Sequence, residues 1–215
     1  MQRSLAKKLL KSHVLSYEHP TQILKKIPRP PCDVFINHRS IDTKRTIASL
    51  LYDNLVRLRI RPFLDNKNMK PGDKLFEKID SAIYGCKLGV AVFSPRYCES
   101  YFCLHELALI METKKKVIPI FCDVKPSELR IVDDGSVPHE QIDRFKKALE
   151  EAKYTVGLAF DSTKGNWSEV LTDAANIVME SLTEIDNGDR MRHLTTMLKS
   201  PIHDVPKICC SNDDN

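Results

Sequence analysis

Glycine is scarce in this sequence: only 7 of the 215 residues are glycine, and they are scattered. Neither G-x-G-x-x-G nor G-x-x-x-x-G-K-[ST] occurs, so the chain has no dinucleotide fingerprint and no P-loop to cradle phosphates. The G-x-S-x-G turn that presents a hydrolase serine is also missing. These absences exclude the motif-based nucleotide-binding and serine-hydrolase classes.

Long apolar runs are missing too. No run approaches the ~18 residues that a membrane-spanning helix requires, and the N-terminus has no apolar stretch followed by a small-residue cleavage site. The seven cysteines form no C-x-x-C pair, so we expect reduced thiols in the cytoplasm or nucleus. Cys98, Cys103 and His105 make a poor metal site, because 103 and 105 point to nearly opposite sides of a helix. No metal is predicted.

Positive charge is concentrated at one end of the chain. The net charge is +4, and residues 1–31 contain seven Lys or Arg against the single acid Glu18. The remainder is slightly acidic, which argues against a broad nucleic-acid-binding face, although the basic segment keeps that alternative open. Because residues 1–31 end in Pro28-Arg29-Pro30-Pro31, we interpret them as a basic flexible arm, with an organelle-targeting or membrane-surface role as the alternative.

From Cys32 onward, short apolar runs alternate with helical patterns. The runs lie at 33–36, 61–64, 88–93, 117–121 and 156–160, and three of them are apolar almost throughout, as strands covered on both faces should be. Apolar residues at helical spacing follow at 47–58, 75–83, 104–111 and 167–182. The pattern predicts an α/β, flavodoxin-like three-layer fold: a five-stranded parallel sheet with helices on both faces.

Domain boundaries follow from composition. We place the folded domain at residues 32–185 and a polar, loose C-terminal tail at 186–215, with Cys209-Cys210 either surface cysteines or an acylation site. A phosphorelay receiver domain has the same layout but needs an aspartate at the end of its third strand. This sequence reads Phe93-Ser94-Pro95 there, so phosphoryl acceptance is not expected.

One acidic residue stands near the start of the helix that follows the third apolar run. In open α/β sheets, ligands bind outside the carboxyl ends of the strands, which is where Glu106 is expected. Glu106 is either part of a reaction centre or a solvated acid at a helix start. In the second case, the helix dipole would stabilise the helix by ~0.3–1 kcal/mol through its attraction to the negative charge.

Five ordered segments within residues 32–182 resemble the motifs of one family. Residues 33–44 (DVFINHRSIDTK) resemble D-V-F-L-S-F-R-G-x-D-T-R, and 92–97 (VFSPRY) resemble V-F-S-x-x-Y. Residues 100–107 (SYFCLHEL) match S-x-W-C-L-x-E-L, and 117–127 (VIPIFCDVKPS) match V-I-P-I-F-x-x-V-x-P-S. With the loop at 63–73, these motifs make the chain similar to plant Toll/interleukin-1 receptor (TIR) domains, of the TIR-only type.

The resemblance implies that Glu106 is the carboxylate of enzymes that cleave NAD+ between nicotinamide and ribose. Ordinary glycosidases need a second acid to protonate the departing oxygen. Nicotinamide in NAD+ is already cationic and leaves as a neutral ring, so one carboxylate that stabilises an oxocarbenium-like transition state is sufficient. No cofactor is expected beyond the substrate NAD+.

Other binding residues are carried over from the same motifs. Phe102 occupies the family's tryptophan position and would stack on a substrate ring, or else be a core aromatic. Ser100 would bond the ribose or cap the helix. Arg39 would meet the pyrophosphate, with an ion pair to Asp42 or Asp65 as its alternative.

Three positions near Arg39 complete this region. Ser40 replaces the family glycine, so the backbone approach to the substrate differs there. We expect Asp42 and Thr43 to cap the first helix.

The segment Asp65–Asp73 is polar and contains the turn signal Pro71-Gly72. By resemblance this loop gates the pocket and inserts into a neighbouring subunit, and Asp65, Lys67 and Gly72 belong to the substrate site. The family's first-helix interface carries S-H-L-Y, where this chain has Leu50 in place of histidine.

The resemblance thus predicts an NAD+ nucleosidase that acts in plant immune and cell-death signalling when it forms homo-oligomers through TIR–TIR contacts. It would release nicotinamide with ADP-ribose or a cyclic variant, and other TIR proteins are further possible partners. A non-enzymatic adaptor is the main alternative. Phosphodiester chemistry on nucleic acid is a third, and it would need the basic arm.

Overall fold

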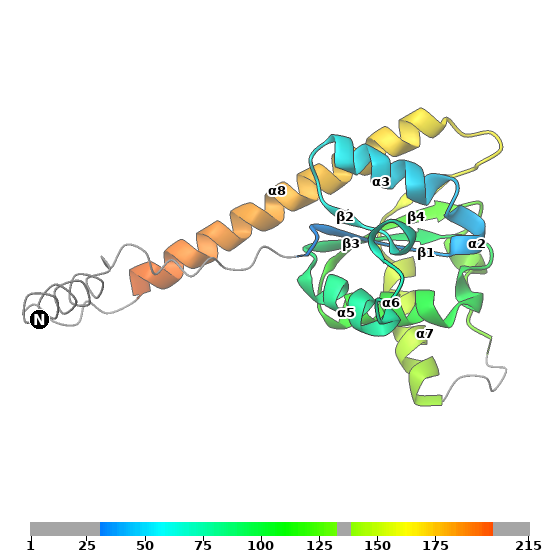
Figure 1. Cartoon of the computed structure of the whole chain (residues 1–215), viewed down its shortest axis with the longest axis horizontal. Helices are drawn as coiled ribbons and strands as arrows, with labels where there is room; N and C mark the ends of the chain where they lie inside the picture. The colour runs from blue at the N-terminus through cyan, green and yellow to red at the C-terminus, as the bar shows by residue number, and fades with distance from the viewer. Residues whose placement is uncertain (1–30, 133–138, 200–215) are drawn as a thin grey trace, which may run out of the picture. The chain divides into compact units, whose positions relative to one another are not determined.

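The computed structural model describes residues 31–132 and 139–199. Five parallel strands form one sheet in the order β2-β1-β3-β4-β5 (Figure 1), which confirms the predicted architecture. The strands are β1 (Val34–His38), β2 (Pro62–Phe63), β3 (Leu88–Phe93), β4 (Lys116–Cys122) and β5 (Leu158–Phe160). The expected arm at residues 1–31 lies outside the described residues apart from Pro31, and Cys209-Cys210 lies wholly outside them.

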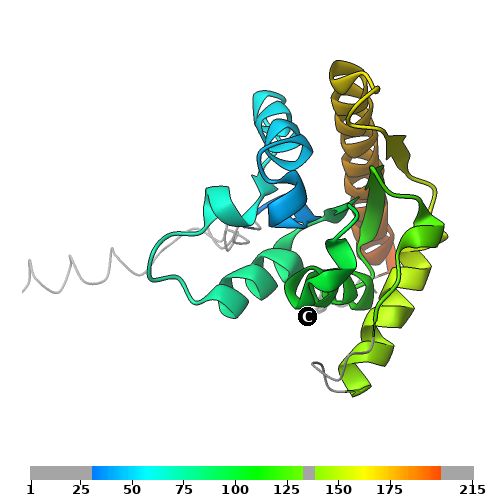
Figure 2. The same ribbon diagram turned by 90° about the vertical axis from the view of Figure 1, so that its right-hand side faces the viewer.

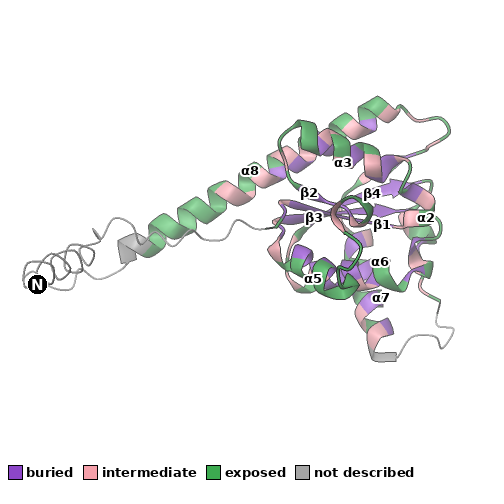
Figure 3. Ribbon diagram, viewed as in Figure 1, coloured by how far each residue is buried: buried purple, intermediate pink, exposed green. Residues whose placement is uncertain are grey.

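Helices cover both faces of the sheet. The helices α3 (Ile47–Arg57) and α8 (Trp167–Lys199) lie on one face, and α5 (Leu75–Gly85), α6 (Tyr101–Glu112) and α7 (His139–Lys153) lie on the other (Figures 1 and 2). Every residue of β1 and β3 is buried (Figure 3). Along β1 the side chains alternate, because successive residues of a strand point to opposite faces: Val34 and Ile36 join the α3/α8 core, and Phe35 joins the α5/α6/α7 core.

Helix α7 was not among the patterns identified in the sequence. Its buried residues Ile142, Phe145, Ala148, Leu149 and Ala152 recur at helical spacing, so the signal was present but diluted by charged neighbours. The helix packs beside α6 and supplies the crossover between β4 and β5.

Short helices occupy several loops at the carboxyl ends of the strands. Helix α2 (Ser40–Thr43) follows β1, α4 (Asp65–Asn68) follows β2, and the 3₁₀ turns η2 (Tyr97–Glu99) and η3 (Pro126–Glu128) follow β3 and β4. These turns place polar residues next to the strand ends.

The last helix is longer than predicted. We expected a loose tail from residue 186, but α8 continues to Lys199, and Asp186 Oδ1 lies 2.6 Å from Lys87 Nζ. The first proline beyond residue 185 is Pro201, so no proline interrupts the helix within residues 186–199. Met191 and Leu194 on this part of α8 are exposed, but the segment is helical and not loose. None of the helices in 31–132 and 139–199 is long and apolar enough to cross a membrane.

Candidate functional site

The carboxyl ends of β1 and β3 lie side by side in the middle of the sheet, with His38 paired to Val92. The chain leaves β1 toward β2 on one side and enters β3 on the other, so the strand order reverses here. This is the topological switch point where ligands bind in open α/β folds. The last two residues of β1 and the start of α6 meet at this place.

Glu106 lies on α6 and faces this junction. It is the sixth residue of the helix, so it is beyond the first turn, and only 9% of its surface is exposed. The alternative of a solvated helix-start acid is therefore wrong. Burial of a carboxylate is costly unless the charge is compensated or the group stays protonated, which makes this position unusual for a residue without a role.

A buried polar network holds the Glu106 side chain. Asn37 Nδ2 donates to Glu106 Oε2 at 2.8 Å and to the carbonyl oxygen of Cys103 at 3.1 Å. The hydroxyl of Tyr97 donates to Asn37 Oδ1, and it lies 3.2 Å from the same Cys103 carbonyl. The network links β1, the turn after β3 and α6.

Burial raises the pKa of Glu106 to about 8. The hydrogen bond from Asn37 acts in the opposite direction and favours the carboxylate, while the negative charges of Asp65 and Asp80 raise the pKa further. Glu106 therefore titrates close to neutral pH, where a group can exist in both protonation states and act as an acid or a base.

Sequence reasoning did not assign Asn37 and Tyr97 to the site. A signal existed for Asn37, because it is a polar residue inside a strand that is otherwise apolar from Val34 to Ile36. Buried polar groups need partners, so such a residue points to a specific contact. Tyr97 belongs to the V-F-S-x-x-Y motif but was not given a role.

His38 and Asp65 meet at the same edge. His38 Nε2 is 3.9 Å from Asp65 Oδ1, is buried, and has no hydrogen-bond partner within the described residues. Burial lowers the pKa of His38, so the imidazole is neutral at physiological pH. The structure thus brings the predicted residue Asp65 to the site, where its charge acts on Glu106.

Ser100 and Phe102 lie at the start of α6. Ser100 is the N-cap of α6, and its hydroxyl accepts a hydrogen bond from the backbone N–H of Cys103 at 3.4 Å. Of the two roles expected for Ser100, the structure therefore shows helix capping. Phe102 is 41% exposed, and its ring packs on Phe76 of α5 at 5.3 Å between centroids. The side chain is therefore a surface aromatic and not a core one.

Arg39 and Ser40 follow β1 directly. Arg39 is half-buried at the N-cap of α2, and its Nε has no hydrogen-bond partner among the described residues. Ser40 is the first residue of α2 and is also half-buried. The expectation that Asp42 caps a helix was wrong: its carboxylate binds Ser94 and Arg96 in the loop after β3.

Lys67 and Gly72 make no contact with the residues that bind Glu106 in the described part of the chain. Lys67 Nζ lies 3.4 Å from Asp53 of α3 and over the ring of Tyr52, so the structure directs it toward α3. Gly72 has φ of +96° in an exposed loop, a conformation that side-chain-bearing residues rarely adopt. The structure therefore does not bring these two predicted residues to the Glu106 network.

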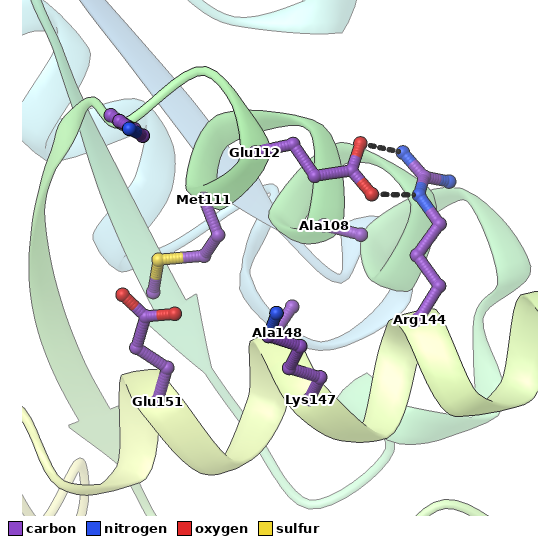
Figure 4. Close-up of a pocket in the computed structure, with 8 residues that line it drawn as sticks. Ala108, Met111, Glu112, Arg144, Lys147, Ala148 and Glu151 are labelled. Atoms are coloured by element: carbon purple, nitrogen blue, oxygen red, sulfur yellow. Dashed lines mark hydrogen bonds and ion pairs between the residues drawn. The ribbon is translucent and has the colours of Figure 1, made fainter.

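A pocket of about 520 Å³ lies between α6 and α7 (Figure 4). Glu112 and Arg144, which both line the pocket, form a bidentate ion pair with N···O distances of 2.5 and 2.9 Å. Glu106 is not among its lining residues. No group of three His, Cys, Asp or Glu side chains suited to a metal ion occurs in 31–132 and 139–199.

Comparison with known proteins identifies relatives of this chain. Over 162 residues the chain is 48% identical to the "Probable 2' cyclic ADP-D-ribose synthase BdTIR" of Brachypodium distachyon, covering 74% of this chain and 72% of that protein. It is 37% identical to the TMV resistance protein N of Nicotiana glutinosa over 67% of this chain, but it spans only 12% of that longer protein.

A solved structure matches as well. The TIR domains of the activated Roq1 resistosome align with a TM-score of 0.58 and 28% identity, over 68% of this chain and 99% of theirs. Residues 32–213 match the family described as TIR domain, a span that runs beyond the boundary predicted at 185. The chain therefore belongs to the TIR domain family.

Proposed function

We propose that this protein is an NAD+ nucleosidase with Glu106 as its catalytic residue. The observation that carries the proposal is the buried carboxylate at the switch point of the sheet, held by Asn37 at 2.8 Å. Membership of the TIR family and the 48% identity to a protein named as a cyclic ADP-ribose synthase support it.

The reaction breaks the bond between the ribose C1′ and the ring nitrogen of nicotinamide. The bonding electrons go to that nitrogen, so the cationic ring leaves as neutral nicotinamide and positive charge develops on the ribose. The carboxylate of Glu106 stabilises this charge across a short distance in a site of low dielectric constant. No acid is needed for the leaving group, which fits a site with one catalytic carboxylate.

The raised pKa of Glu106 suits a second task. With a pKa of about 8, roughly a tenth of the side chains are ionised at pH 7 in the free protein. The positive charge of the nicotinamide ring in bound NAD+ favours the ionised form of Glu106 and so lowers its pKa. After nicotinamide leaves, the carboxylate accepts the proton of the attacking oxygen, either from water to give ADP-ribose or from a substrate hydroxyl to give a cyclic product. The name of the BdTIR relative supports the cyclic product.

We further propose that activity depends on assembly. In the single chain only 9% of Glu106 is exposed, so a substrate reaches it after the surrounding loops rearrange. The loop around Gly72 and the side chain of Leu50, 44% exposed on α3, offer surfaces for contact between copies. The solved TIR relative comes from an assembled resistosome. The name of the TMV resistance protein N supports a role in plant immunity, and we propose in addition that this role includes cell-death signalling in the cytoplasm or nucleus.

The test is NAD+ turnover against protein concentration for the parent and Glu106→Gln. Chromatography of nicotinamide, ADP-ribose and cyclic products should show turnover that rises more steeply than concentration and falls at least 100-fold in the variant. Glu112→Gln is the matched control, because Glu112 lies on the same helix and pairs with Arg144 at the surface. Complete inertness of assembled parent protein would indicate a non-enzymatic adaptor.

A further inference from the structure

Within residues 31–132 and 139–199, the Glu106 carboxylate accepts a hydrogen bond at one oxygen only. We propose that Asn37 and Tyr97 are positioning residues: they hold Glu106 by Oε2 and leave Oε1 to face the substrate. The proposal rests on the proposed function and assigns these two residues a role in the same reaction.

The orientation of the Asn37 amide follows from its neighbours. The carbonyl oxygen of Cys103 accepts hydrogen bonds and cannot donate, so the group 3.1 Å from it must be the NH₂ of Asn37. The same NH₂ then faces Glu106 Oε2, and Oδ1 faces the hydroxyl of Tyr97, which donates to it. Both hydrogens and the oxygen of the amide are thereby used.

Tyr97 is fixed in turn by packing. It is fully buried, and its ring contacts Phe93 at the end of β3 with centroids 4.7 Å apart. A buried hydroxyl without a partner would cost free energy, and here Asn37 provides that partner. The result is a chain of fixed groups from the end of β3 to the carboxylate.

The other carboxylate oxygen, Oε1, accepts no hydrogen bond from any of the described residues. One oxygen is therefore anchored and the other is available to the developing charge on the ribose. Holding a catalytic group in one orientation before the substrate arrives is a recognised contribution to rate.

The ionisable groups around Glu106 allow the hydrogen bond from Asn37 to be tested through the pH dependence of activity. Burial raises the pKa of Cys103 to about 12 and places that of Tyr97 well above its usual range, while burial lowers the pKa of His38. None of these three changes charge near pH 8. Facing carboxylates come from two further helices, Asp65 from α4 and Asp80 from α5, and they act as negative charges on Glu106.

Two substitutions test the proposal. Asn37→Ser ends the side chain at the γ atom, one bond short of Nδ2, and Tyr97→Phe keeps the ring but removes the hydroxyl. Because the N–H of Asn37 favours the carboxylate, Asn37→Ser should raise the pKa of Glu106. We expect kcat/KM for NAD+ at pH 7 to fall about 10-fold in Asn37→Ser, with a smaller fall in Tyr97→Phe.

The pH profile separates positioning from structural damage. The acidic limb of kcat/KM should move about one pH unit upward in Asn37→Ser, so that the deficit shrinks by pH 9, while KM stays within about threefold. Asn54→Ser is the matched control, because Asn54 donates to Leu171 on the other face of the sheet. It should keep the parent profile.

The outcomes distinguish the two proposals. If Glu106→Gln abolishes turnover but Asn37→Ser and Tyr97→Phe keep the parent rate and pH profile, the positioning role is wrong and the proposed function stands. If Glu106→Gln is as active as the parent, the proposed function is wrong. Urea unfolding across pH reads the pKa of Glu106 without substrate, and an unchanged pH dependence in both variants would also overturn the positioning role.

Discussion

Asp42, just after β1, and Arg96, just after β3, are joined by a hydrogen bond of 2.8 Å between Arg96 Nε and Asp42 Oδ1. The other oxygen of Asp42 accepts from Ser94 Oγ at 2.7 Å and from the backbone N–H of Arg96 at 3.1 Å. The two loops that flank the switch point are therefore tied together by one carboxylate.

We expect Asp42→Asn to destabilise the fold by about 1–3 kcal/mol, because it removes a charged acceptor of three hydrogen bonds. These hydrogen bonds and the charge of Arg96 lower the pKa of Asp42, so its contribution is present above the unfolded pKa and is lost as pH falls through the folded value. Urea unfolding at pH 7 and pH 3 measures both effects. Asp53→Asn removes an exposed pair with Lys67 and should change stability by less than about 1 kcal/mol. Equal losses in the two variants would contradict the role of Asp42.

The difference in unfolding free energy between Glu106→Gln and the parent should grow in favour of the variant as pH rises. The unfolded chain ionises this group near its ordinary pKa of 4.5, whereas the folded chain keeps the proton until about pH 8. Folding therefore binds a proton between these values, and the stability of the parent falls by about 1.4 kcal/mol per pH unit at most. Glutamine is neutral throughout, so its advantage should grow from pH 5 to pH 8.

Unfolding in urea at pH 5, 6.5 and 8 measures this advantage. Glu112→Gln is the control on the same helix: the hydrogen bonds and charge of Arg144 lower the pKa of Glu112, so its effect should be constant over this range. A difference between parent and Glu106→Gln that does not change with pH would show that Glu106 is ionised normally in the folded state.

The fold could be predicted from the sequence because its strands are buried on both faces. Such strands appear as apolar runs, and β3 is the clearest case, from Leu88 to Phe93. Helix α7 escaped prediction because charged residues surround its apolar positions. The last part of α8, residues 186–199, escaped prediction because polarity does not indicate whether a segment is helical.

The site was predictable only in part, for a different reason. A motif indicated Glu106, but the sequence does not reveal which residues contact it across the sheet. Asn37 is 69 positions away along the chain, and its contact depends on the parallel pairing of β1 with β3. Lys67 shows the converse: it is close to Asp65 in sequence, yet its contacts lie on α3.

Phe102→Ala should weaken NAD+ binding with little loss of stability. The ring is 41% exposed and contacts Phe76 at 5.3 Å, so its removal leaves no internal cavity. If the exposed face stacks on a substrate ring, KM should rise about 10-fold, in line with the ~1–3 kcal/mol of aromatic–base stacking. Phe102→Trp keeps the stacking surface and should retain the parent KM. An unchanged KM in Phe102→Ala would remove this residue from the binding site.

Leu50→Asp should weaken self-association if the face of α3 that carries Leu50 is a contact between copies. Leu50 is 44% exposed, and a charge there would have to be desolvated in an apolar contact. Sedimentation should show a weaker oligomer, and NAD+ turnover should fall at low protein concentration and recover at high concentration. Val56→Asp is the control, because Val56 is 47% exposed on the same helix about 120° around its axis. Loss of turnover at every concentration, with association unchanged, would instead place Leu50 outside the interface.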